Sequence, residues 1–398
     1  MRGHPWILAL ALAGIPASGG VAQEVTFGGQ VRPRYEFRDT AGTGSDGFTS
    51  MRVRAHVSAT LERQVKVFVQ IQDVRLWGEE TSTLGDFQAD NFDLHQGYVE
   101  VQQSPTEALS LRARIGRQEA AFGAERLIGP VGWTQQSRSF DGVRLSAHGG
   151  FGTVDVIGFR LAEATAPSIT ADALLAGAYA TLDGIAGGAL DLYGIYDRVA
   201  GAAGQDRGTV GARLVGQQSV ISYRVEGSYQ FGELGDLDVS AFMFAARVGA
   251  SFARGLAGLT LWYDYLSGDD DPADGDSKVF DTLFATNHPF YGFADLFTNI
   301  PLHTGGLGLQ DIAVKGSLTP RDDVRLNVDV HSFHLAKQGA LTSKHLAEEI
   351  DLTANYRYSP NLTVTAGFSQ IFQATALGDL GRLSDDMSWV YVMLNATF

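Results

Sequence analysis

The 398-residue sequence contains no cysteine, which excludes a disulfide scaffold and any metal site built on thiolates. Beyond its first residues it lacks an apolar run of about 18 residues, so no transmembrane helix is expected. Basic residues are scarce, because 30 Lys and Arg face 45 Asp and Glu, a formal net charge of −15. This acidic balance argues against nucleic acid as a partner.

The first 22 residues have the three parts of a secretory signal. Arg2 lies in a short n-region, an apolar run extends from Trp6 to Ile15, and small residues lead to Ala22. The apolar run is too short to span a bilayer as a helix. We predict cleavage after Ala22 and one domain over residues 23–398.

Apolar and polar residues alternate with a period of two in many segments of the remaining chain. In residues 51–62, Met51, Val53 and Ala55 share one face, whereas Arg52 and Arg54 share the other. Such alternation fits a soluble sandwich or a barrel wall. The segments run about 10 residues or more, which suits a tilted membrane strand better than a soluble strand of about 5–6. A soluble core could not hold so many unpaired arginines, whereas a water-filled lumen could.

Short and long connections alternate along the chain, as expected of a transmembrane antiparallel barrel. Short turns are expected near Arg63, Pro105, Gly149, Gly184, Gln217, Gly255, Pro320 and Pro360. Long loops are expected around Gly44, Gly85, Pro130, Ala166, Gly204, Gly232, Gly292, Gly339 and Asp379. These connections predict an all-β barrel of about 18 strands with short periplasmic turns and long extracellular loops.

The last segment, residues 387–398, alternates like the others and ends on the aromatic Phe398. It resembles the C-terminal strand by which bacterial outer-membrane barrels are recognised for assembly. We therefore expect the barrel-assembly machinery and outer-membrane lipid as partners, and the outer membrane of a Gram-negative bacterium as the location.

Five stretches together resemble the alginate-export porin family. They are residues 68–78, 116–133, 138–145, 266–297 and 348–359. The resemblance implies an eighteen-stranded outer-membrane barrel. It also implies passive secretion of an anionic uronic-acid polymer through an arginine-lined, electropositive constriction.

The candidate solute path is made of arginines that the alternation places on the lumen face or near strand ends. They are Arg32, Arg34, Arg52, Arg54, Arg75, Arg112, Arg114, Arg117, Arg126, Arg138, Arg144, Arg224, Arg247 and Arg357. A guanidinium is always charged and binds carboxylates bidentately. The alternative is that these arginines brace loops by ion pairing. The bracing carboxylates would be Asp73, Glu119, Glu125, Asp141 and Asp351.

Two long loops are candidates for narrowing the pore. Residues 119–136 would fold into the mouth and set the constriction. The segment 287–295 would fold inward as a lid or cover the rim, with Asn287, His288, Tyr291 and Asp295 as its polar residues. An EF-hand frame over the acidic residues 269–281 would need an oxygen ligand where Pro272 stands, so no metal site is predicted.

The sequence favours a channel over an enzyme, since it has no GxSxG, HExxH or P-loop motif. No catalytic residue and no cofactor is predicted; Ser139 and His148 are present, but no spacing singles them out. The main hypothesis is a porin for passive diffusion or export of an anionic solute, an acidic polysaccharide such as alginate among them. The alternatives are a general or differently selective porin, an outer-membrane enzyme, and a closed structural or adhesion barrel.

Overall fold

The computed structural model describes residues 24–42, 44–79, 92–165, 169–201 and 204–398. The signal segment expected over residues 1–22, and most of the loop expected around Gly85, lie outside these residues. No helix in the described ranges is both long enough and apolar enough to cross a bilayer.

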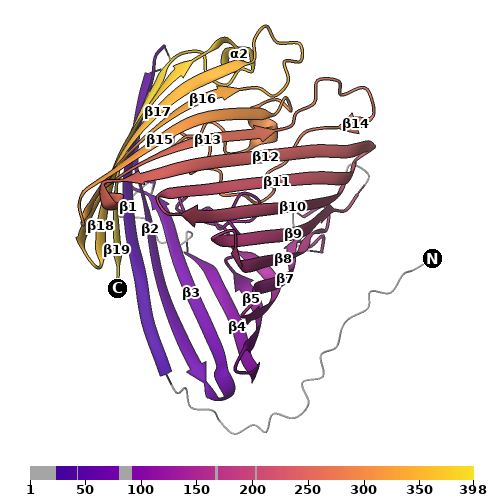
Figure 1. Cartoon of the computed structure of the whole chain (residues 1–398), viewed down its shortest axis with the longest axis vertical. Helices are drawn as coiled ribbons and strands as arrows, with labels where there is room; N and C mark the ends of the chain where they lie inside the picture. Colours follow the sequence, from indigo (N-terminus) through magenta and orange to yellow (C-terminus); the bar gives the residue numbers. More distant parts are fainter. Residues whose placement is uncertain (1–23, 43, 80–91, 166–168, 202–203) are drawn as a thin grey trace.

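In the described chain, eighteen long antiparallel strands form the wall of a closed barrel (Figure 1). They are β1 (Glu24–Thr40), β2 (Gly44–Leu61), β3 (Val65–Leu76), β4 (Phe92–Thr106), β5 (Leu109–Gln118), β6 (Phe140–Gly149), β7 (Gly152–Ala162), β8 (Ala173–Ile185), β9 (Gly188–Val199), β10 (Gln205–Gln218), β11 (Ile221–Leu234), β12 (Leu237–Phe252), β13 (Ala257–Leu266), β15 (Leu309–Arg321), β16 (Val324–His334), β17 (His345–Ser359), β18 (Leu362–Gln373) and β19 (Met387–Thr397). The ring closes because β1 pairs with both β2 and β19.

The remaining elements are short and belong to connections. Strand β14 (Asp276–Ser277) pairs in parallel with β12. The helices are η1 (Glu62–Gln64), η2 (Ala253–Gly255), α1 (Ile300–His303) and α2 (Thr375–Asp379). In Figure 1, β1–β4 and β10–β13 cross at a steep angle, as opposite walls of a barrel with tilted strands do.

The predicted alternation of inward polar and outward apolar residues is confirmed. On β11, Arg224 and Glu226 are buried, whereas Val225 and Tyr229 are 43% and 45% exposed. The C-terminal strand β19 likewise exposes Val390 and Val392. Apolar side chains on the outer wall of such a barrel face hydrocarbon, so their exposure carries no penalty.

All eight predicted short turns are found, but three connections expected to be long are short. β1 ends at Thr40 and β2 begins at Gly44, while β11 ends at Leu234 and β12 begins at Leu237. The connection between β9 and β10 spans only residues 200–204. Polar and glycine-rich residues continue the ladder there, for example Arg38 opposite Asp46. Backbone pairing needs no apolar side chain, so polarity did not mark the strand ends.

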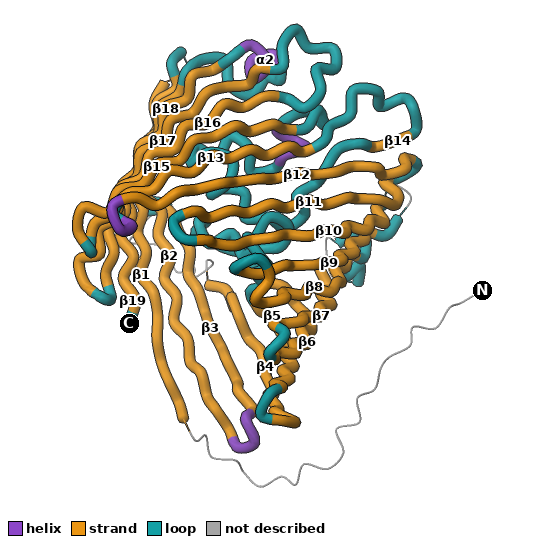
Figure 2. Tube along the Cα trace, in the orientation of Figure 1, coloured by secondary structure: helices purple, strands orange, loops and turns teal. Residues whose placement is uncertain are grey.

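Two connections fold into the barrel and fill part of its lumen. Residues 119–139 join β5 to β6, and residues 267–308 join β13 to β15; loop segments are visible inside the ring of strands (Figure 2). Phe280, Phe297 and Ile300 of the second loop are fully buried against wall residues such as Leu266 and Phe333. The lumen is therefore partly an apolar core, and any path for water must run beside it.

Candidate functional site

Four arginines lie together on the lumen face of two neighbouring strands. Arg32 and Arg34 alternate along β1, and Arg52 and Arg54 alternate along β2. Arg32 stands directly opposite Arg52, and all four side chains are buried. Directly opposed residues of an antiparallel pair have Cβ atoms about 5 Å apart, so like charges there destabilise the sheet unless something compensates them.

The compensation comes from the backbone of the first inner loop. Arg32 donates to the carbonyls of Gly132 (2.7 Å), Trp133 (3.0 Å) and Thr134 (2.8 Å). Arg52 donates to the carbonyls of Thr134 and Gln135, each at 3.3 Å. The arginines predicted to face solute therefore also hold the constriction loop against the wall.

The four arginines differ in how their charge is balanced. Arg34 pairs with Glu36 at 2.8 Å and Arg54 with Glu119 at 3.3 Å. Within the described ranges, neither Arg32 nor Arg52 forms an ion pair. A carbonyl supplies only a partial charge, so these two guanidinium groups leave a local excess of positive charge in the lumen.

Glu119 anchors the base of the constriction loop to the wall. Its Oε1 accepts from Arg54 (3.3 Å) and Ser137 (3.3 Å) and lies 2.7 Å from Nε2 of His95 on β4. Burial alone would raise the pKa of Glu119, but the bond to His95 and the charge of Arg54 outweigh it, so the pKa is lowered. Glu119 lies at the start of the loop and Ser137 lies near its end. This carboxylate therefore connects both ends of the loop to Arg54 on β2 and His95 on β4.

Arg126 anchors the opposite side of the same loop. It makes a bidentate pair with Asp264 on β13 (2.7 and 3.0 Å) and lies 3.5 Å from Glu226 on β11. It also donates to the Tyr291 hydroxyl at 3.1 Å. Burial would lower the pKa of Arg126, but the facing carboxylates raise it. Arg126 was predicted to face solute, yet it is 3% exposed and serves as a brace.

The two inner loops are bound to each other. Their backbones exchange hydrogen bonds, from Gly129 N to Phe284 O and from Phe284 N to Leu127 O, both at 2.8 Å. Arg138 also donates to the Phe284 carbonyl, and burial lowers the pKa of its guanidinium. Trp133 stacks on His288 with ring centroids 4.1 Å apart and planes at 6°. The loops therefore form one inner body, which we call the plug (residues 119–139 and 267–308).

The segment predicted as a lid lies inside the barrel rather than over its rim. Asn287, His288 and Tyr291 are buried, and His288 lies 2.8 Å from Asp295. Two carboxylates of the wall strand β17 bind the backbone of this segment: Glu349 accepts a hydrogen bond from Ala294 N at 2.8 Å, and Asp351 accepts one from Phe293 N at 3.3 Å. Asp351 thus braces the loop through its backbone rather than through an arginine.

The other predicted arginines divide into two sets by their register. On the lumen face, Arg112 and Arg114 lie 3.6 and 2.7 Å from Glu100, and Arg144 lies 2.8 Å from Asp155. Arg224 and Arg247 also face the lumen, while Arg357 is exposed and donates to the Asp322 carbonyl beside a short turn.

Two predicted arginines have the opposite register to the lumen-facing set, although both also border the cavities beside the plug. Register places Arg75 opposite Met51, and Arg117 opposite Gly97 and Asp141, on the side away from Arg52 and Arg114. Arg75 pairs with Asp73 at 2.5 Å and Arg117 with Asp141 at 2.7 Å. Asp73 and Asp141 therefore pair near the rim and hold no inner loop, contrary to the bracing prediction.

Glu125 also departs from its predicted bracing role. It forms no ion pair with any described residue; instead its backbone carbonyl accepts from Thr286 N at 2.9 Å. The backbone of Glu125 has a positive φ of 62°. The sequence showed a carboxylate in the right loop, but the turn uses the peptide group rather than the side chain.

Two cavities lie between the plug and the wall formed by β1–β5. The outer cavity is about 470 Å³ and is lined by Arg34, Glu36, Arg38, Phe48, Ser50, Val74, Arg75, Leu76, Glu79, Trp133, Thr134, Gln135, Gln136 and Asp295. The inner one is about 290 Å³ and is lined by Gln72, Val74, Asp93, His95, Arg117, Gln136, Ser137 and Ser139. They adjoin at Val74 and Gln136, and together they form a candidate route beside the plug along the end of β3 away from its short turn.

Arg38 belongs to this route but is absent from the predicted set. It continues the β1 alternation of Arg32, Arg34 and Glu36, and its guanidinium lies 5.7 Å from the Trp389 ring. Extending the period-two pattern by one more residue pair would have found it.

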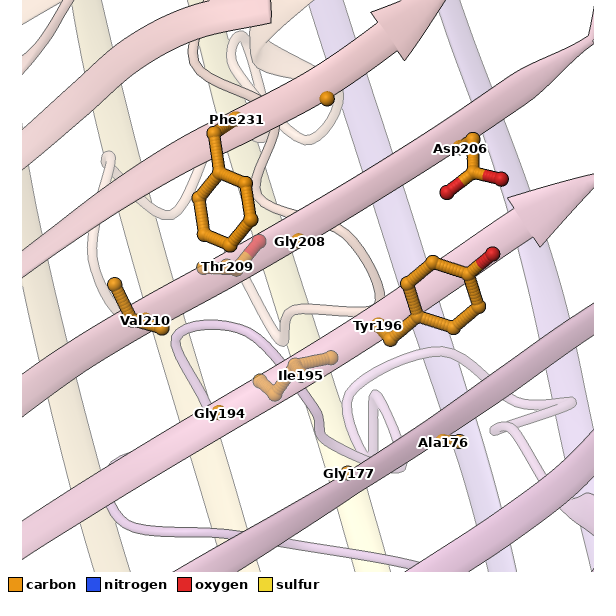
Figure 3. Close-up of a pocket in the computed structure, with 11 residues that line it drawn as sticks. Ala176, Gly177, Gly194, Ile195, Tyr196, Asp206, Gly208, Thr209, Val210 and Phe231 are labelled. Atoms are coloured by element: carbon orange, nitrogen blue, oxygen red, sulfur yellow. The ribbon is translucent and has the colours of Figure 1, made fainter.

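A larger recess of about 490 Å³ lies on the outward face of β8–β11. Glycines at 177, 194 and 208 form its floor, and Tyr196 and Phe231 flank it (Figure 3). Both aromatic side chains are exposed on the outer wall. This recess faces away from the lumen and takes no part in the route along β3. In the described ranges, no cluster of three or more His, Asp or Glu could hold a metal ion.

A protein-family model described as alginate export matches residues 23–389. Among solved structures, OprD from Pseudomonas aeruginosa is similar, with a TM-score of 0.63, 13% identity and coverage of 96% of each chain. OccAB4 from Acinetobacter baumannii has a TM-score of 0.63 and 10% identity, covering 95% of this chain and 98% of that one. OccK2 from Pseudomonas aeruginosa, solved in complex with glucuronate, has a TM-score of 0.60 and 11% identity, covering 95% and 99%. No curated protein matches the chain.

Proposed function

We propose that this bacterial outer-membrane channel passes anionic solutes, with a uronate-containing polysaccharide as its candidate cargo. The chain belongs to the alginate export family, and the proposal starts from this membership. Channel and location follow from the family, and the apolar outer wall meets membrane lipid. The anionic selectivity and the residues that produce it are our proposal. The glucuronate bound by OccK2 shows that a barrel of this fold can hold a sugar acid.

One observation carries the proposal, namely the opposed pair Arg32 and Arg52. The pair is buried beneath the first inner loop, next to Arg34 and Thr134 of the outer cavity, and has no carboxylate partner among the described residues. Fixed charge in a water-filled constriction with low-dielectric walls concentrates counter-ions and sets selectivity. The formal charge of −15 is compatible with this because acidic residues gather in exposed connections, as Asp269–Asp271 do.

The proposed path runs along β3 between the plug and the wall. A solute would meet Arg34 and Arg38 in the outer cavity and Gln72 and Gln136 in the inner one. It would then continue towards Arg114 on β5, which lies closer to the short turns than either cavity. Most of these arginines already have a carboxylate partner, so each holds a solute anion weakly. Weak successive sites let a solute enter and leave, as conduction requires.

The rival is a general porin in which arginines only brace loops. The many arginine–carboxylate pairs, such as Arg144 with Asp155, favour it. Liposome swelling with glucuronate and with glucose would separate the two functions. The double variant Arg32→Gln and Arg52→Gln keeps donors for the loop carbonyls but removes both charges.

We expect this variant to lower the ratio of glucuronate to glucose uptake about twofold to tenfold, from Coulomb energies across several ångströms of water-like medium. Arg321→Gln is the matched control, because Arg321 lies at a short turn outside the candidate path, pairs with Asp323 at 2.6 Å, and 67% of its side chain is exposed. An unchanged ratio in the double variant would favour the general porin.

An enzyme is the second alternative, and one arrangement calls for a test. Ser139 Oγ lies 3.3 Å from His95 Nδ1, and His95 Nε2 lies 2.7 Å from Glu119. This resembles a nucleophile, base and carboxylate chain. We propose that it anchors the loop instead, because Glu119 is shared with Arg54 and Ser137.

A fluorophosphonate probe decides between anchor and catalyst, since it labels activated serines. No labelling of Ser139 is expected, and labelling that disappears in Ser139→Ala would establish a catalytic serine. His148, the other histidine considered from the sequence, contacts Thr153 at the far end of β6 and does not pair with Ser139.

A further inference from the structure

Three residues on neighbouring strands form a row of hydrogen-bond donors on the lumen face. Arg224 on β11 stands opposite Arg247 on β12, and Arg247 stands opposite Trp262 on β13. Paired strands lie about 4.8 Å apart and opposed residues share a face, so the three side chains stand side by side. Arg224 and Trp262 are 3% and 8% exposed.

The row lies in the periplasmic half of the barrel. Arg224 is the fourth residue of β11, which begins at Ile221 directly after a short turn. Trp262 is the sixth residue of β13, which follows the short η2 turn. Phe290 of the plug packs above the row, with its ring centroid 5.9 Å from that of Trp262 and 5.5 Å from the Arg224 guanidinium.

The donors of this row have no acceptors in the described structure. The side chains of Arg224 and Arg247 form neither an ion pair nor a hydrogen bond with any described residue; their guanidinium carbons lie 5.0 and 5.3 Å from the Trp262 ring. The indole Nε1 of Trp262 is buried without an acceptor. A buried donor normally has a partner, so the unpaired indole N–H beside two guanidinium groups without acceptors calls for an explanation.

The carboxylates nearest the row are engaged elsewhere. Glu226 and Asp264 both face Arg126, which takes Asp264 bidentately. Asp329 pairs with Lys315 at 3.0 Å. The charges of Arg224 and Arg247 therefore have no carboxylate partner of their own.

We infer that Arg224, Arg247 and Trp262 form a carboxylate-binding site for a sugar acid or one unit of a polyuronate, on the wall opposite the Arg32–Arg52 pair. Two guanidinium groups suit the two oxygens of a carboxylate, and the indole N–H supplies a third donor. The strand order puts this wall across the ring from β1 and β2. The site rests on the proposed anionic function and adds a position where solute is held on the periplasmic side of the plug.

The test uses the full-length barrel inserted in one orientation into a planar bilayer. Sodium glucuronate is added on the periplasmic side, and the concentration that halves the chloride current is measured. Trp262→Phe keeps the ring but removes the N–H, and Arg247→Gln removes one charge. Arg321→Gln is the control, because it removes an exposed guanidinium at the short periplasmic turn after β15 that pairs with Asp323 at 2.6 Å and lies outside the candidate path.

Each of the two variants is expected to raise the half-blocking concentration about tenfold, the effect of losing one hydrogen bond to a charged group. The control should change it less than twofold. Equal block in wild type, Trp262→Phe and Arg247→Gln, in a channel that still prefers anions, would overturn the site and leave the proposed function intact. A wild-type channel that prefers cations would instead overturn the proposed function. If Arg247→Gln does not insert, Trp262→Phe alone decides.

Discussion

Replacement of Arg126 by methionine should release the plug from the wall. The variant leaves Asp264 and Glu226 without their shared cation, and their side chains are only 0% and 4% exposed. Breaking a buried ion pair by removing one partner costs about 3–5 kcal/mol. Since about 1.4 kcal/mol is a factor of ten, the ratio of released to seated plug should rise roughly a hundredfold to a few thousandfold.

Single-channel recording measures this change directly, because a released plug widens the path. We expect larger and more frequent steps of conductance in Arg126→Met than in wild type. Arg213→Met is the matched control: Arg213 pairs with the buried Asp191 at 2.6 Å, and these two wall residues border the plug at Gly123 but form no ion pair with its described residues. Adding Asp264→Asn and Glu226→Gln to Arg126→Met should bring the size and frequency of the conductance steps back towards those of the wild type, because no unpaired charge then remains buried. Identical conductance in wild type, Arg126→Met and Arg213→Met would refute the bracing role.

Three further predictions concern the loop base, the inner aromatic cluster and the chain end. Because the pKa of Glu119 is depressed below its ordinary value of 4.5, its anchoring holds above that value and is lost only as pH falls through the lower folded pKa. Current noise in wild type should therefore rise only below pH 4.5, whereas Glu119→Gln should be noisy at pH 7; a quiet variant would contradict this. Trp133→Ala removes the stack on His288 and the Arg34 contact at 4.1 Å, and should raise conductance without changing ion preference; an unchanged conductance would speak against the coupling. Phe398 pairs through its backbone with Gly29, and we propose that it also contacts the assembly machinery. Deletion of Phe398 should lower the amount of heat-modifiable barrel in outer membranes several-fold, and an amount equal to that of the wild type would contradict this role.

The sequence predicted the barrel because its wall repeats one simple rule. The alternation of Arg52 and Arg54 with Met51 and Val53 needs only the period-two geometry of a strand and an apolar environment outside. Short turns were also predictable, since Gly, Pro and Asp break the alternation near Pro105 and Pro360. Long connections were less predictable: the polar residues 44–47 look like part of a loop but form ladder pairs such as Asp39 with Ser45.

The site was predicted only in part, for a different physical reason. The period-two alternation predicted that Arg32 and Arg52 face the lumen. It did not predict that backbone carbonyls of the first inner loop would accept hydrogen bonds from their guanidinium groups. The alternation did not assign a face to Arg75 and Arg117, which lie near strand ends, and their register is opposite to that of Arg52 and Arg114. Which partner a guanidinium finds depends on contacts between segments more than a hundred residues apart, as for Arg126 and Asp264, and no local pattern encodes them.

Reversal potential across a tenfold potassium chloride gradient tests the central claim most directly. The wild-type channel should show a potential whose sign means that chloride permeates more readily than potassium, and the variant with Arg32→Gln and Arg52→Gln should move it towards zero. A potential of the opposite sign in the wild type would show a cation-preferring pore and contradict the account.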